Sequence, residues 1–84
     1  MKYYEELIER IILVIEERLY VHVDYEEGVE GYELTLSPLT NDDFKSSFKV
    51  HYRDLERNEA VLSVTQNVVA SFISDYKDSI YRPN

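Results

Sequence analysis

Apolar residues recur every three to four positions over residues 3–18, which is the spacing of one face of an α-helix. At about 100° per residue, they form a stripe of Tyr4, Leu7, Ile8, Ile11, Val14, Ile15 and Leu19. The pattern predicts an amphipathic helix whose apolar stripe anchors the core of the protein.

The other side of this helix carries a row of carboxylates. The row comprises Glu5, Glu6, Glu9, Glu16 and Glu17. We expect these side chains to face away from the core and to be solvated. Leu13 falls among them, where a large apolar side chain gains nothing from water. A buried contact with a partner would account for Leu13, although single exposed leucines are common.

After the helix the chain changes to an alternation of apolar and polar residues, which predicts strands with one buried face. This alternation covers residues 19–25, 32–37 and 48–53. Residues 26–31 form an acidic turn that closes a hairpin and contains Glu26, Glu27 and Glu30. Residues 38–43 are rich in turn formers and predict a loop.

Residues 59–66 allow two interpretations. The β-branched residues Val61, Val64 and Thr65 favour a fourth strand, with the last helix starting near Ser63, where Ser63 and Gln66 resemble a capping box. Alternatively, Asn58 caps a long helix that begins at Glu59. The balance favours a strand followed by a helix. The final helix is predicted by helical spacing of Val68, Val69, Phe72, Ile73, Tyr76 and Ile80.

These elements predict a single small acidic domain over residues 1–84, of the α+β class. It comprises an N-terminal helix, a three- or four-stranded antiparallel meander sheet and a C-terminal helix. We expect both helices on one sheet face, which leaves the other face wet. The chain contains no cysteine, so its core depends on apolar burial alone. Eight tyrosines suggest that several rings lie at the edge of the core with their hydroxyls in water.

The net charge of −8 is concentrated in the first part of the chain. Residues 1–33 hold ten acids and three bases, giving −7, whereas residues 34–84 hold seven acids and six bases, giving −1. This distribution argues against direct binding of nucleic acid or of an anionic membrane, and it permits a partner with a basic surface. The longest apolar run, Ile11–Ile15, is far shorter than the roughly 20 residues of a membrane helix. We expect a soluble, cytoplasmic protein.

No residue pattern indicates catalysis, a cofactor or a metal site. There is no G-x-S-x-G motif, and two glycines cannot build a phosphate-binding loop. His22 and His51 fall on the polar sides of non-adjacent predicted strands, roughly 9.6 Å apart, which is too far to share an ion. Lys49, His51 and Arg53 form a small basic group on the outer sheet face. A cross-strand pair of Glu33 with Arg53 accounts for it better than nucleic-acid binding does.

The acidic helix and turn are therefore the best candidates for a functional surface. Five carboxylates within 13 residues give about one per 3.6 Å of helix, close to the roughly 3.4 Å charge spacing of a DNA strand. In size, acidity and order of elements the chain resembles small phage-encoded inhibitors of nucleic-acid enzymes, anti-CRISPR proteins among them, without a shared motif. We expect a non-catalytic module that binds a basic protein surface, in its sharper form as a phosphate mimic. The alternative is a homo-oligomeric or structural subunit, such as a homodimer, that uses exposed sheet surface and the residues Ile12 and Leu13 beside the stripe.

Overall fold

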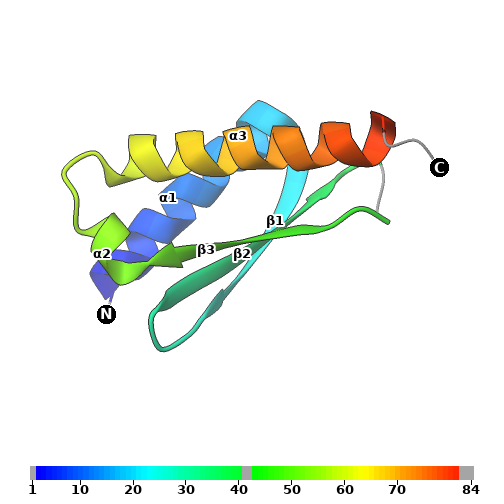
Figure 1. Ribbon diagram of the computed structural model, residues 1–84. Coiled ribbons are helices and arrows are strands. Elements are labelled where there is room, and N and C mark those ends of the chain that lie inside the picture. Colours follow the sequence, from blue (N-terminus) through cyan, green and yellow to red (C-terminus); the bar gives the residue numbers. More distant parts are fainter. Residues whose placement is uncertain (1, 41–42, 82–84) are drawn as a thin grey trace.

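The computed structural model describes residues 2–40 and 43–81 as two long helices packed on a three-stranded sheet (Figure 1). In chain order, the elements are α1 (Lys2–Leu19), β1 (Val21–Glu27), β2 (Gly31–Pro38), β3 (Ser46–His51), α2 (Tyr52–Leu55) and α3 (Ala60–Tyr81). The strands pair antiparallel in the order β1-β2-β3, so β1 and β3 are the edges of the sheet. The predicted α+β meander between two helices is confirmed.

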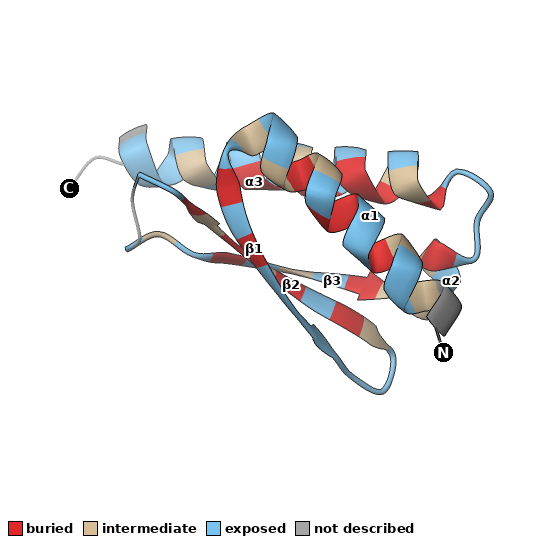
Figure 2. Ribbon diagram, turned by 180° about the vertical axis from the view of Figure 1, so that it is seen from behind, coloured by how far each residue is buried: buried red, intermediate tan, exposed pale blue. Residues whose placement is uncertain are grey.

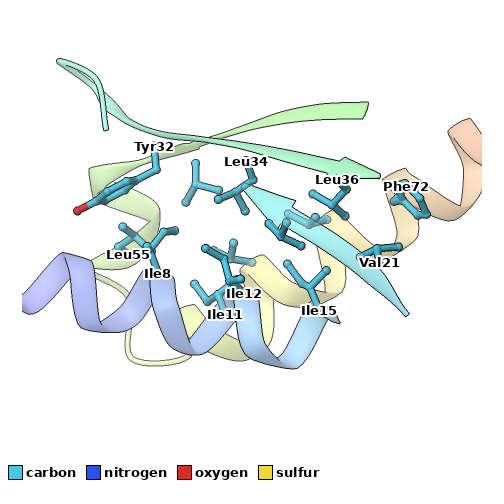
Figure 3. Close-up of a cluster of buried hydrophobic side chains, with 14 residues drawn as sticks. Ile8, Ile11, Ile12, Ile15, Val21, Tyr32, Leu34, Leu36, Leu55 and Phe72 are labelled. Carbon is cyan, nitrogen blue, oxygen red and sulfur yellow. The ribbon is translucent and has the colours of Figure 1, made fainter. Parts of the chain in front are cut away.

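The core lies between the inner face of the sheet and the two long helices (Figure 3). Six of its largest side chains are fully buried: Ile8, Ile11, Ile15, Leu34, Leu36 and Leu55. Ile12 is also buried, with 7% of its surface exposed, whereas Val14 is only half-buried. The stripe of α1 is therefore rotated slightly from the predicted one, and Ile12 belongs to the core rather than to a free surface. Figure 2 shows buried positions alternating with exposed or half-buried ones at the start of β1 and along β2.

The predicted fourth strand at residues 60–64 is wrong, because this segment is the start of α3. The buried residues Ala60, Val64, Val68 and Phe72 recur every four positions, which is helical spacing. Burying this stripe against the core outweighs the β preference of the valines, a preference that spans only about 1 kcal/mol. The alternative of one long helix over this segment is the observed one, and the helix begins at Ala60, one residue later than that alternative placed it.

The third strand begins and ends two residues earlier than predicted, at Ser46 and His51. The Asp54 carboxylate accepts a 3.3 Å hydrogen bond from the His51 backbone N–H, and Leu55 is fully buried. These contacts turn the chain into α2, so Arg53 lies on a helix. Lys49 is the residue opposite Glu33 in the sheet, and the predicted Glu33–Arg53 pair is wrong.

Candidate functional site: an acidic surface beside a tyrosine cluster

The carboxylates of α1 divide between two sides of the helix. Glu9 faces β1, where its Oε2 accepts a 3.4 Å hydrogen bond from the Tyr25 hydroxyl. Glu16 also faces β1, and its Oε2 accepts a 3.1 Å hydrogen bond from the Val23 backbone N–H. Because Glu16 is half-buried by this contact, the expectation that the whole row is solvated is wrong at Glu16.

Leu13, Glu6 and Glu17 lie on the side of α1 that points away from the sheet. All three are exposed, and the exposed fraction of the Leu13 side chain is 66%. The predicted position of Leu13 among exposed carboxylates is thus confirmed. Arg10, which is also exposed, is one helical turn from Glu6 and from Leu13, so this outer side of α1 presents one apolar, two acidic and one basic side chain.

The three acids of the β1–β2 hairpin, two at the end of β1 and Glu30 in the turn, point in different directions. Glu27 lies on the inner side of the hairpin, where its Oε2 accepts a 2.7 Å hydrogen bond from the Tyr52 hydroxyl. Glu26 lies on the outer sheet face, opposite Glu33 in the register. Glu30 is exposed in the turn, and its backbone carbonyl accepts a 3.0 Å hydrogen bond from the Tyr52 N–H. Of these three hairpin carboxylates, only that of Glu27 forms a hydrogen bond with a neighbouring element in the described part of the chain.

Four tyrosine rings lie between the start of α1 and this hairpin, and we call them the tyrosine cluster: Tyr4, Tyr25, Tyr32 and Tyr52. The ring centroids are 5.0 Å apart for Tyr4 and Tyr52, 5.8 Å for Tyr32 and Tyr52, and 6.0 Å for Tyr25 and Tyr32. Such separations are typical of favourable aromatic pairs. The cluster connects α1, β1, β2 and α2 into one surface.

The tyrosine cluster was not predicted as a unit. The tyrosine content and the inner positions of Tyr25 and Tyr32 pointed to rings at the edge of the core. Their proximity to Tyr4 and Tyr52 depends on how α1 and α2 pack on the sheet. The hydroxyls of Tyr25 and Tyr52 lie at exposed positions, where each donates a hydrogen bond to a carboxylate.

Burial and the surrounding carboxylates raise the pKa of three hydroxyls of the cluster, those of Tyr25, Tyr32 and Tyr52. The hydrogen bond to Glu27 raises the pKa of Tyr52 to about 12, with desolvation and the charge of Glu27 adding to the effect. Burial raises the pKa of Tyr25, and the charges of Glu9 and Glu5 raise it further. Burial likewise raises the pKa of Tyr32, followed by the charges of Glu27 and Glu5. Glu5, Glu9 and Glu27 therefore act on the same tyrosine rings although they come from separate segments.

The histidines lie apart from this surface and from each other. His22 Nε2 is 3.0 Å from Asp24 Oδ1 on the exposed outer face of β1, and His51 ends β3 beyond the intervening strand β2. Within residues 2–40 and 43–81, no group of three or more potential metal-ligating side chains is found. In the same residues, neither long helix has an apolar stretch of the length and hydropathy that a membrane span requires.

Comparison with protein-family models, with curated proteins and with solved structures found no match in any of the three. The functional argument therefore depends on the geometry and charge of the described residues.

Proposed function

We propose that this protein is a non-catalytic binding module that docks on a basic surface of a partner protein through α1 and the β1–β2 hairpin. The observation that carries the proposal is the convergence of Glu5, Glu9 and Glu27 on the tyrosine cluster. Two of these carboxylates are held by tyrosine hydroxyls, at 3.4 Å for Glu9 and 2.7 Å for Glu27. Carboxylates held in place lose less side-chain freedom on binding than mobile ones, which favours affinity.

Tyrosine rings beside carboxylates suit arginine and lysine side chains in particular. A guanidinium group forms paired hydrogen bonds with a carboxylate and stacks on an aromatic face. Tyr25 offers such a face, with 39% of its surface exposed. Leu13, Glu6 and Glu17 extend this surface around α1 and supply an apolar contact within it.

The sharper form of the proposal is that the basic surface is one that otherwise binds nucleic acid. The acidic row of α1 has a charge spacing close to that of a nucleic-acid strand, as the sequence indicates. Glu16 contributes less to this row than its position suggests, because its carboxylate is turned toward β1. A partner identified for this protein is therefore expected to release DNA or RNA when the protein binds to it.

An NMR titration with an oligoarginine peptide tests the proposal. Amide signals of α1 and of residues 25–30 should shift at low salt, and the shifts should weaken strongly as salt is added. The variant Glu6→Lys/Glu17→Lys should weaken binding, since both side chains are exposed and form no hydrogen bond within the described residues. The control Glu56→Lys/Asp78→Lys makes the same change in net charge away from this surface. Equal weakening by both variants would contradict the proposal.

A second candidate, the homo-oligomeric or structural subunit, is favoured by an apolar groove at the other end of the molecule. Leu39, Ile73 and Tyr20 line this groove, with 64%, 40% and 77% of their surfaces exposed. Phe72 and Tyr76 form its floor within α3. Sedimentation at increasing protein concentration separates the two candidates. A dimer that persists at high salt and is lost in Leu39→Lys would favour the homo-oligomeric subunit. A monomer at every concentration would rule out that candidate.

A further inference from the structure

A second groove runs between α1 and the beginning of α3, on the flank of α1 opposite Glu9 and Glu16. Its basic side chains are Arg10 and Arg18 from α1 and Arg57 from the segment before α3. Arg10 and Arg18 are eight residues apart, which separates them by about 12 Å along the axis of α1 and by about 80° around it. We call this feature the arginine groove.

The arginine groove is locally basic in an acidic protein. Glu59 is its only acidic lining residue, against the three arginines. All three arginines are exposed, and within the described residues none of them forms an ion pair with a carboxylate. Three guanidinium groups are thus available to an anion in a molecule whose net charge is −8.

The first turn of α3 adds backbone donors to the groove. The N–H groups of Ala60 and Ser63 donate to the carbonyls of Arg57 and Glu59, at 3.1 and 2.8 Å. The N–H groups of Val61 and Leu62, at the open end of the helix, are left for acceptors outside it. The positive end of the helix dipole lies at the same place and favours an anion.

The buried side chain of Thr65 is a separate observation that points to a ligand in the groove. Its side chain lines the groove one turn into α3, and only 2% of its surface is exposed. Within residues 2–40 and 43–81, the Thr65 hydroxyl has no hydrogen-bond partner. Buried polar groups without partners are rare in folded proteins because each one costs about 1–3 kcal/mol. A bound acceptor at this position would satisfy the hydroxyl.

We propose that the arginine groove binds a small amphiphilic anion, with a phosphate or carboxylate group attached to an aliphatic body. The anionic group would be bound by the arginines, by the first-turn amides of α3 and by the Thr65 hydroxyl. The aliphatic body would cover Leu7, Val14 and Leu62, which line the same groove. Leu62 in particular is 55% exposed although it is a large apolar residue. This proposal does not rest on the acidic surface, although the two surfaces adjoin at Arg10, one helical turn from Glu6.

An NMR titration of the full chain with inorganic phosphate, octyl phosphate and octanoate tests this proposal, with both octyl compounds kept below their micelle concentrations. Amide shifts are expected at residues 7–18 and 57–65. At least one octyl compound should bind more tightly than inorganic phosphate, and comparing the two identifies the preferred anionic group. Shifts spread over the whole surface, or no gain in affinity from the octyl chain, would overturn the proposal.

Matched charge variants locate the site. Arg10→Gln/Arg57→Gln should lower the affinity for the better octyl compound by about tenfold, since each arginine supplies a charge-assisted hydrogen bond. The control Arg53→Gln/Lys77→Gln makes the same change in net charge outside the groove and should leave the affinity within about twofold. An equal loss in both variants would mean that general electrostatics, and not the groove, attract the anion.

Thr65→Val tests the orphaned hydroxyl while keeping the shape of the side chain. The variant should raise the melting temperature of the free protein, because an unpaired buried hydroxyl is removed. It should also weaken binding of the better octyl compound by several-fold. A higher melting temperature with unchanged affinity would overturn the role assigned to Thr65.

Discussion

The carboxylate of Glu16 in α1 accepts a hydrogen bond of 3.1 Å from the backbone N–H of Val23 in β1. Because β1 is an edge strand, this N–H points away from its neighbour β2 and has no partner in the sheet. Glu16 takes the place of a further strand at this position. One acidic residue of α1 thus protects the edge of the sheet, whereas its neighbour Glu17 is exposed.

We expect Glu16→Ala to lower the free energy of unfolding by about 1–2 kcal/mol, since a charge-assisted hydrogen bond is lost from a half-buried site. Hydrogen exchange at the Val23 amide should become faster. Glu17→Ala is the control, because it makes the same change of residue on the exposed side of the helix. Chemical denaturation and exchange measured by NMR check both variants, and equal destabilisation would contradict a specific role for Glu16.

The Tyr52–Glu27 hydrogen bond predicts a loss of stability at high pH. The pKa of Tyr52 is raised to about 12 in the folded protein, compared with an ordinary value of 10.0. The folded state therefore keeps the phenol proton that the unfolded state releases. The resulting stabilisation is complete below about pH 10 and is lost as the pH rises to about 12. Denaturation at a series of alkaline pH values measures this decrease.

Glu27→Gln should move the pKa of Tyr52 down toward its ordinary value, because the neutral amide removes the charge next to the phenol. Because the chain has eight tyrosines, the difference in phenolate absorbance between this variant and the unsubstituted protein follows the titration of Tyr52. Glu26→Gln is the control. It removes the same charge as Glu27→Gln, but Glu26 lies on the opposite face of the same strand. If the pKa of Tyr52 stayed high in Glu27→Gln, burial, and not Glu27, would be the main cause of the raised pKa.

The two glycines of the hairpin are expected to differ sharply in their tolerance of a side chain. A Cβ at Gly31 would collide with the Val50 carbonyl oxygen and lie 2.8 Å from the His51 Cα. At Gly28 the nearest atom to a Cβ would be the Gly31 carbonyl oxygen at 3.7 Å, which is an ordinary contact. Gly31→Ala should therefore destabilise the fold by about 3 kcal/mol or more, because β2 and β3 must separate.

Gly28→Ala is the matched variant and should change stability by less than about 1 kcal/mol. Thermal unfolding of the pair is sufficient to test this difference. Similar melting temperatures for the two variants would contradict the close approach of Gly31 to β3.

Tyr20 connects α1 to β1 with a backbone φ of 53°, a left-handed conformation that is uncommon for a residue with a side chain. Its N–H donates a 3.0 Å hydrogen bond to the Glu16 carbonyl, which ends the helix in the manner usually served by glycine. Since 77% of the Tyr20 surface is exposed, the ring contributes little burial. We expect Tyr20→Gly to stabilise the fold by up to about 1 kcal/mol. A lower melting temperature in this variant would indicate that the Tyr20 ring makes a stabilising contact.

Local periodicity predicted most of the fold. The spacing of Ile8, Ile11 and Ile15 is helical whatever lies around them, and the alternation in β1 and β2 indicates strands in the same way. The acidic segment with its two glycines predicted the hairpin, but the turn itself is limited to residues 28–30, because Glu26 and Glu27 belong to β1 and Gly31 to β2. The segment 59–66 was the failure, because Val61, Val64 and Thr65 prefer strands locally while Ala60, Val64 and Val68 bury one helical stripe.

The candidate surfaces were predictable only in part. Exposure of Leu13, Glu6 and Glu17 followed from the helical pattern. The sequence pattern did not predict that the Glu16 carboxylate points toward the edge of β1. It also did not predict that Glu26 and Glu27 lie on opposite faces of the hairpin. The arginine groove was missed because Arg57 and Thr65 are distant in sequence from Arg10 and Arg18.

By itself, the sequence determined that α1 is amphipathic, that the sheet has one buried face and that most of the negative charge lies in the first 33 residues. Those properties follow from residue spacing and composition, which do not depend on distant contacts. Only the tertiary structure decided what each flank of α1 faces: the β1 edge and the tyrosine cluster on one side, and α3 with the arginine groove on the other. The reason is physical, since helical periodicity defines one apolar stripe but leaves the neighbours on either side of it to be chosen by packing.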